Sequence, residues 1–119
     1  MKTHSFLDGN LKHDTDLRGD GKPSIKNIYL SIAKENALNN NYNPDLLTFS
    51  NDGIHKLNYD GINFGRVGYN DFIIYQLMGD ESALMKRKNY LARASKIKGN
   101  WKNNEMSPNN LAQKILWMG

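Results

Sequence analysis

Residues 46–64, LLTFSNDGIHKLNYDGINF, decide the fold of this chain. The stretch contains three short runs rich in apolar and β-branched residues, at 46–50, 54–59 and 62–64. Turn-forming sequences separate them, Asn51-Asp52-Gly53 and then Asp60-Gly61. Asp-Gly supplies the positive φ angles that a tight hairpin requires. The stretch therefore predicts a three-stranded antiparallel β-meander.

Side chains alternate between the two faces of the middle strand of this meander. One face carries His55, Leu57 and Tyr59, and the other carries Ile54, Lys56 and Asn58. One of these faces can pack on a helix while the other meets solvent.

Capping residues and helical spacing predict about four short helices packed with the meander. The expected N-caps are Ser24, Asn70 or Asp71, Ser82, and Ser107 followed by Pro108. Gly79 and Gly99 are expected to end the second and third helices. The expected helices cover residues 25–38, 72–77, 83–98 and 108–116.

The predicted fold class is therefore α+β, with a single domain at residues 24–119. Residues 1–23 form a polar N-terminal arm whose anchors are Phe6, Leu7, Leu11 and Leu17. Such a segment frays unless something holds it. We expect the arm either to fold back on its own domain or to reach a neighbouring subunit.

The composition limits the classes of function. The chain has 119 residues and no cysteine, which excludes disulfides and thiolate metal sites. No run approaches the roughly 18 apolar residues of a membrane span. The first residues lack the apolar stretch of a signal peptide. We expect a protein in a reducing compartment, either inside a cell or packaged in a particle, and no contact with a membrane.

Positive charge is concentrated near the third predicted helix. Residues 81–102 contain seven Lys or Arg and one acidic residue, a local charge of +6, whereas the other 97 residues carry −2. A local basic field favours an acidic partner, nucleic acid included. The alternative is a solvated helix face without a partner.

Three basic residues of this helix, Lys86, Arg93 and Lys96, lie on one flank at about 100° per residue and can contact phosphates. Beside them runs a predicted core face of Ala83, Tyr90, Leu91, Ala94 and Ile97. Arg87 falls within that apolar arc, so it should either snorkel outward or contact a carboxylate or carbonyl. A structural or protein-binding role is the alternative for this helix. The candidate residues for binding nucleic acid or another acidic partner are Lys86, Arg87, Lys88, Arg93, Lys96, Lys98, Lys102 and Arg66.

Aromatic residues are frequent in the second half of the chain, and they can either stack on bases or fill the core. A small domain poor in aliphatic residues needs its aromatic rings inside, so core packing is favoured. The aromatic residues expected to have a structural role are Phe64, Tyr69, Phe72, Tyr90, Trp101 and Trp117.

Signals of catalysis are weak throughout the sequence. His4, His13 and His55 lie in separate elements without metal-ligand spacing. No nucleophile elbow or phosphate-cradling P-loop is present. Asp60 and Asp71 could hold a metal as in a nuclease, but no other residue supports that role. We therefore expect a protein that is not an enzyme and that has no metal, cofactor or small-molecule substrate.

The region 62–117 resembles an uncharacterised family of small proteins encoded by large DNA viruses and tailed phages. The resemblance rests on these residues: Phe64-Gly65, Gly68-Tyr69-Asn70-Asp71, Arg87-Lys88-Asn89-Tyr90-Leu91-Ala92-Arg93, Trp101 and Leu116-Trp117. Ala94 departs from the pattern, since the family often has His there. The family has no established activity. The resemblance implies a viral origin and a small module for binding rather than turnover.

The expected function is that of a minor structural component of a virus or phage particle, associated with its head or capsid. The arm and the basic helix would dock on other viral structural proteins or on packaged nucleic acid. Its location would be the virion or the interior of the host cell. The alternative is a nucleic-acid-binding accessory protein that acts during infection.

Overall fold

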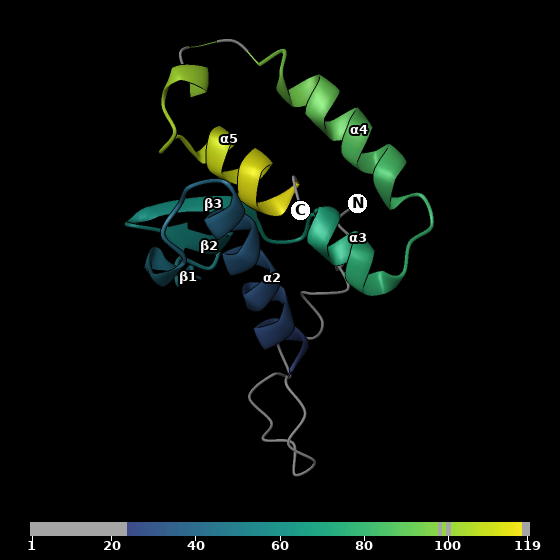
Figure 1. Ribbon diagram of the computed structural model, residues 1–119, viewed down its shortest axis with the longest axis horizontal. Helices are drawn as coiled ribbons and strands as arrows, with labels where there is room; N and C mark the ends of the chain where they lie inside the picture. Colours follow the sequence, from purple (N-terminus) through teal and green to yellow (C-terminus); the bar gives the residue numbers. More distant parts are fainter. Residues whose placement is uncertain (1–23, 98, 100, 118–119) are drawn as a thin grey trace.

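The computed structural model describes residues 24–97, 99 and 101–117, so the predicted arm and Lys98 lie outside the described residues. Its sheet has three antiparallel strands in the order β1-β2-β3, namely β1 (Leu47–Phe49), β2 (His55–Tyr59) and β3 (Ile62–Arg66). Helices pack around this sheet (Figure 1). The prediction of an α+β fold built on a β-meander is confirmed.

The hairpin between β2 and β3 closes as its sequence predicts. Tyr59 pairs with Ile62, and the two residues between them have positive φ, +49° at Asp60 and +91° at Gly61. The side chain of Asn58 accepts a hydrogen bond from the Gly61 amide at 3.0 Å. This turn fixes the register of the two strands that later form one side of a cleft.

The first described helix, α2 (Ile25–Asn39), starts where its cap predicts. The Ser24 side chain accepts a hydrogen bond from the Asn27 amide at 3.1 Å. Asn36 is buried and donates from Nδ2 to the Ile115 carbonyl at 2.9 Å, which ties α2 to the C-terminal segment. A short 3₁₀ turn, η1 (Pro44–Leu46), then leads into the sheet.

Helix α3 (Phe72–Met78) also follows its sequence signals. Asp71 is its N-cap and accepts from the Ile74 amide at 3.0 Å, while Gly79 ends it with a left-handed φ of +72°. Buried residues fill its first turn, Phe72, Ile73 and Ile74. The choice between Asn70 and Asp71 is thereby settled in favour of Asp71.

Helix α4 (Ala83–Ala94) is shorter than predicted. It ends at Ala94 with Ser95 as its C-cap, and beyond that end the carbonyl of Ile97 accepts a hydrogen bond from the Trp101 indole at 2.8 Å. Ile97 is consequently 46% exposed, so its placement on the core face was wrong. Ser82 occupies the predicted N-cap position, but its hydroxyl donates to Asp80 Oδ1 at 2.7 Å and makes no capping hydrogen bond to the helix.

The C-terminal part of the described chain consists of a 3₁₀ turn followed by a helical segment. A 3₁₀ turn, η2 (Trp101–Asn103), precedes α5 (Pro108–Leu111), which continues as the π-helical η3 (Ala112–Leu116). The Ser107 hydroxyl caps α5 as predicted, with Pro108 at the first helical position. In Figure 1, α2 and α5 lie between the sheet at one end of the body and α3 and α4 at the other.

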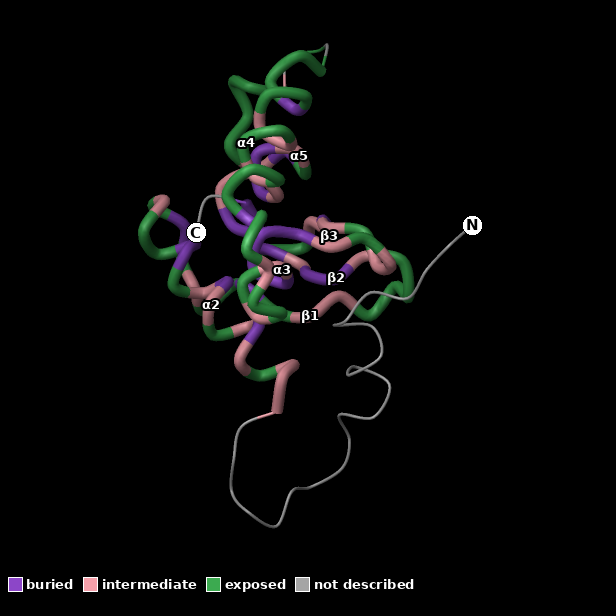
Figure 2. Tube along the Cα trace, turned by 90° about the vertical axis from the view of Figure 1, so that its right-hand side faces the viewer, coloured by how far each residue is buried: buried purple, intermediate pink, exposed green. Residues whose placement is uncertain are grey.

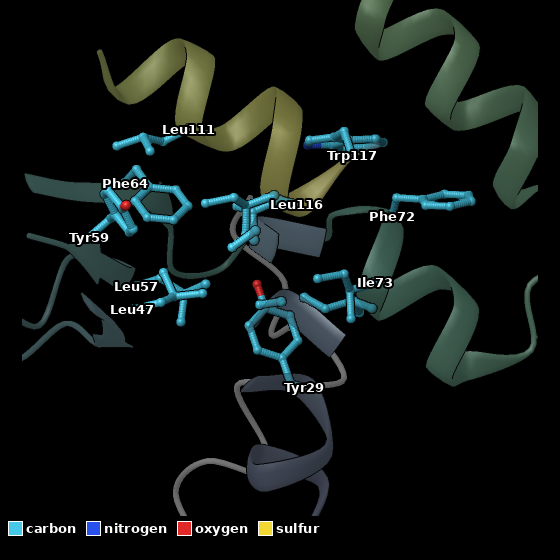
Figure 3. Packing of buried hydrophobic residues seen from close by; sticks show 14 of the residues in the cluster. Tyr29, Leu47, Leu57, Tyr59, Phe64, Phe72, Ile73, Leu111, Leu116 and Trp117 are labelled. Carbon is cyan, nitrogen blue, oxygen red and sulfur yellow. The ribbon is translucent and has the colours of Figure 1, made fainter. Parts of the chain in front are cut away.

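The core forms where α5 and η3 meet the sheet. Leu116 is 1% exposed and lies at the centre of the cluster, between Phe64 of the sheet and Phe72 of α3 (Figure 3). Most of β2 is buried, whereas α4 is exposed over most of its length (Figure 2). Among the described helices, none has the length and apolar character needed to cross a membrane.

Gly65 offers a test of this packing, because its φ is +73° and an added Cβ would lie 2.7 Å from Leu116 Cδ1. Gly53 is the matched control, since its φ is +75° and nothing lies near its missing Cβ. Gly53→Ala should cost about 1 kcal/mol for the positive φ alone. Gly65→Ala should cost about 2–4 kcal/mol, because buried Leu116 must also move. Urea unfolding measures both, and equal losses would contradict this packing.

Candidate functional site

A cleft of about 530 Å³ lies between the sheet, the loop that follows β3, helix α4 and the C-terminal helical segment. Four stretches that are distant in the sequence supply its walls. The residues that give the cleft its chemical character are Lys56, Arg66, Tyr69, Asp71, Tyr90 and Arg93.

The floor of the cleft is a buried ion pair between Lys56 of β2 and Asp71 before α3. Lys56 Nζ lies 3.0 Å from Asp71 Oδ2, and the two side chains are 2% and 3% exposed. The Tyr29 hydroxyl of α2 donates to the same carboxylate oxygen at 2.6 Å. Lys56 also donates to the Tyr69 carbonyl, and Asp71 Oδ1 accepts from the Ile74 amide. Both charges are therefore paired and hydrogen-bonded, as burial requires.

The expectation that one face of the middle strand would meet solvent is wrong at Lys56, which is buried. Strand alternation places it opposite the face of Leu57 and Tyr59, but it is only 4% exposed. The loop ending at Asp71 covers it and supplies the carboxylate that makes its burial possible. A lysine within a strand gave no sign of a partner fifteen residues later, so sequence reasoning missed this residue.

Two arginines provide the free positive charge of the cleft. Arg66 stands at the end of β3 and Arg93 in the last turn of α4, and both are exposed. Within the described part of the chain, neither guanidinium has a carboxylate at ion-pair distance. Since Lys56 and Asp71 cancel, the cleft carries an excess of two positive charges at neutral pH. Its surroundings therefore favour an anion.

Tyr69 is the residue whose predicted role the structure contradicts most clearly. It was expected to pack in the core, but it is 66% exposed and lines the cleft. Gly68, with a φ of +95°, reverses the chain just before Tyr69, and Lys56 donates a hydrogen bond to the Tyr69 carbonyl. The backbone of Tyr69 is thus fixed while its ring is accessible to a partner.

The remaining predicted aromatics are buried or partly buried. Phe64, Phe72 and Trp117 are buried as expected. Tyr90 stacks on Trp117 with ring centroids 4.0 Å apart and an interplanar angle of 3°, which fixes α4 against the C-terminal segment. Burial raises the pKa of Tyr90, so its ring is neutral at physiological pH. Trp101, the first residue of η2, is partly buried and does not line the cleft.

The three residues of the basic ridge predicted on α4, Lys86, Arg93 and Lys96, have different surroundings in the structure. Lys86 pairs with Asp80 at 2.5 Å and lies 4.4 Å from the centroid of the Tyr75 ring. The hydrogen bond from Lys86, followed by those from Ser82, lowers the pKa of Asp80 to about 2, so the pair is charged at neutral pH. Arg93 points to the cleft region, whereas Lys96 does not line it.

The other predicted basic residues have separate surroundings. Arg87 is half-buried and lies 5.3 Å from the centroid of the Phe72 ring, so it packs along the apolar arc. Lys88 is exposed on the surface of α4, and Lys102 lies 5.8 Å from the Trp101 ring. Of the predicted binding set, the structure brings only Arg66 and Arg93 together at the cleft among the residues it describes.

The alternative nuclease arrangement is not assembled. Asp60 is exposed in the hairpin turn between β2 and β3, and Asp71 is neutralised by Lys56. His55 lines the cleft, but its Nδ1 lies 2.6 Å from Asp52 Oδ2. Across the described ranges, no group of three His, Asp or Glu side chains is placed to hold a metal ion. The charge of Arg66 and Arg93, unpaired within the described chain, suits binding of an anion.

Several residues that carry the viral resemblance meet at this cleft. They are Phe64, Gly65, Tyr69, Asn70, Asp71, Tyr90, Arg93, Leu116 and Trp117. Trp101 and most of the segment from Arg87 to Arg93 do not line the cleft, and membership of that family stays a prediction. Comparison with known proteins identifies no matching family model, no similar curated protein and no similar solved structure.

A double-mutant cycle tests the floor of the cleft. Lys56→Met and Asp71→Asn should each lower the free energy of unfolding by about 3–5 kcal/mol, because each leaves one buried charge unpaired. Asn at position 71 still provides a helix-capping oxygen. The double variant should cost less than the sum of the two by about 1–3 kcal/mol. Additive losses in urea unfolding would show that the two charges are not coupled.

Proposed function

We propose that this protein is a non-enzymatic module that binds single-stranded nucleic acid through the cleft between the sheet and α4. One observation carries the proposal. Arg66 and Arg93, without carboxylate partners in the described chain, lie around one cleft with the exposed ring of Tyr69.

These groups match the two chemical features of an unpaired strand. Arginine binds phosphate oxygens through its planar fork of N–H donors. An exposed tyrosine ring offers a surface on which a base can stack, and such stacking tolerates every base. A duplex keeps its bases stacked inside, so the exposed Tyr69 ring favours a single strand.

The proposed binding site is the cleft and not the outer face of α4. Lys86 is already paired with Asp80, and the exposed side chains of Lys88 and Lys96 do not line the cleft. Their charge still contributes to the long-range field that attracts a polyanion. Contact with the strand itself is assigned to the cleft.

The role of a minor virion component stays a prediction. That role was expected to depend on docking through the basic helix and through the arm at residues 1–23, and the arm lies outside the described residues. A cleft for single strands suits a protein that contacts packaged nucleic acid, and it suits equally an accessory protein of infection. Mass spectrometry of purified particles, if the source is a virus, separates the two: a fixed stoichiometry supports the virion role and absence from particles removes it.

Fluorescence anisotropy with labelled single-stranded DNA and RNA dodecamers tests the proposal. The protein should bind at low salt, with affinity falling as KCl rises. Arg66→Gln/Arg93→Gln should lower affinity about 100-fold, since two charge-assisted contacts are lost. The slope of log K against log salt should fall by about 1.4 in magnitude.

Lys88→Gln/Lys96→Gln is the matched control, because it removes the same charge from exposed positions of α4 and the segment after it. This control should lose less than about fivefold, the effect of the general field alone. An equal loss in both double variants would assign binding to the basic helix instead of the cleft. No binding of either nucleic acid at low salt would overturn the proposal.

A further inference from the structure

The size of the cleft bears on how much of a strand it can hold. Its volume of about 530 Å³ lies within the range of roughly 300–1,000 Å³ typical of pockets that enclose one small ligand. Proteins that follow a strand along its length instead use grooves with sites of about 4–16 nucleotides. The cleft therefore suits one nucleotide held from several sides rather than a continuous tract.

The charge of the cleft bears on the kind of phosphate it can hold. Arg66 and Arg93 leave an excess of two positive charges once Lys56 and Asp71 cancel. An internal phosphodiester carries a single negative charge. A terminal phosphomonoester carries about −1.5 to −2 at neutral pH and has three acceptor oxygens. The cleft matches the charge of the terminal group more closely.

Two polar groups at the cleft have hydrogen-bonding capacity beyond the bonds given for them within the described chain. Lys56 Nζ has three donors, of which the Tyr69 carbonyl and the Asp71 carboxylate take two. Asn70 Oδ1 is buried and has no hydrogen-bond partner among the described residues, and Asn70 lines the cleft. A buried acceptor of this kind needs a donor, which a sugar hydroxyl or a base amine can supply.

We infer that the cleft binds the end of a nucleic-acid strand that carries a terminal phosphomonoester. The phosphate would lie between Arg66 and Arg93, and the terminal base would stack on Tyr69. This inference rests on the proposed function, and it specifies which part of the strand enters the cleft. A 5′-phosphate and a 3′-phosphate offer the same group, so the experiment separates them.

The test compares dodecamers of one sequence, each with the fluorophore on an internal base. Four forms are measured by anisotropy: a 5′-phosphate, a 3′-phosphate, hydroxyls at both ends, and a covalently closed circle. One phosphorylated form should bind at least about tenfold more tightly than the hydroxyl-ended and circular forms. The form that binds best identifies the end that is recognised.

Two variants connect the preference to the cleft. Arg66→Gln/Arg93→Gln should abolish the preference for a phosphorylated end, whereas Lys88→Gln/Lys96→Gln should retain it. Tyr69→Ala should weaken binding of the phosphorylated and the hydroxyl-ended linear forms about tenfold. Tyr69→Phe should bind these forms as tightly as the unchanged protein, because stacking needs only the ring. All four side chains substituted in the double variants are exposed, as is Tyr69, and circular dichroism checks that the variants fold.

Different results would contradict the binding of single strands and the recognition of a phosphorylated end. If circular and hydroxyl-ended strands bind as tightly as the phosphorylated forms, recognition of an end is wrong while binding of single strands stands. The same conclusion follows if Arg66→Gln/Arg93→Gln keeps the full preference for a phosphorylated end. If no form binds, the proposed function itself fails.

Discussion

The ion pair between Lys56 and Asp71 is the interaction on which the cleft depends. Removing two charges from water costs several kcal/mol for each ion, so such a pair persists only with close geometry and further hydrogen bonds. Asp71 meets this condition by capping α3, pairing with Lys56 and accepting from Tyr29. One carboxylate thereby joins β2, α3 and α2.

The ion pair also organises what lies above it. Lys56 holds the carbonyl of Tyr69, which places the exposed ring of that residue at the cleft. On the opposite side, Trp117 follows the buried η3 segment and stacks on Tyr90, which positions the last turn of α4 and Arg93. The charged and aromatic groups of the cleft are thus placed by buried contacts, so they need little reordering when a ligand binds.

Local sequence signals predicted most of the secondary structure because their causes are local. The Asp60-Gly61 turn and the caps at Ser24, Asp71 and Ser107 each satisfy backbone groups within three residues. The α+β class follows from them. Helical spacing overestimated the length of α4, which ends at Ala94, and beyond that end the Ile97 carbonyl accepts from the Trp101 indole.

The cleft was beyond prediction from the sequence because its parts meet only through tertiary contacts. Helical geometry grouped Lys86 with Arg93, but Asp80 pairs with Lys86 and leaves Arg93 to face the sheet side. Strand alternation gave no reason for Lys56 to be buried, since its carboxylate partner lies beyond β3. An exposed tyrosine cannot be distinguished from a core tyrosine by composition alone, so Tyr69 was assigned to the core.

The central claim is that a nucleic-acid strand enters this cleft and does not lie along the outer face of α4. A titration of ¹⁵N-labelled protein with a single-stranded DNA dodecamer, followed by two-dimensional ¹H–¹⁵N NMR, tests it most directly. The account predicts that the largest shift changes fall on the amides of Gly65, Arg66, Tyr69 and Asn70 and on the guanidinium of Arg93. Shift changes confined to Lys86, Lys88 and Lys96, with the cleft resonances unmoved, would contradict it.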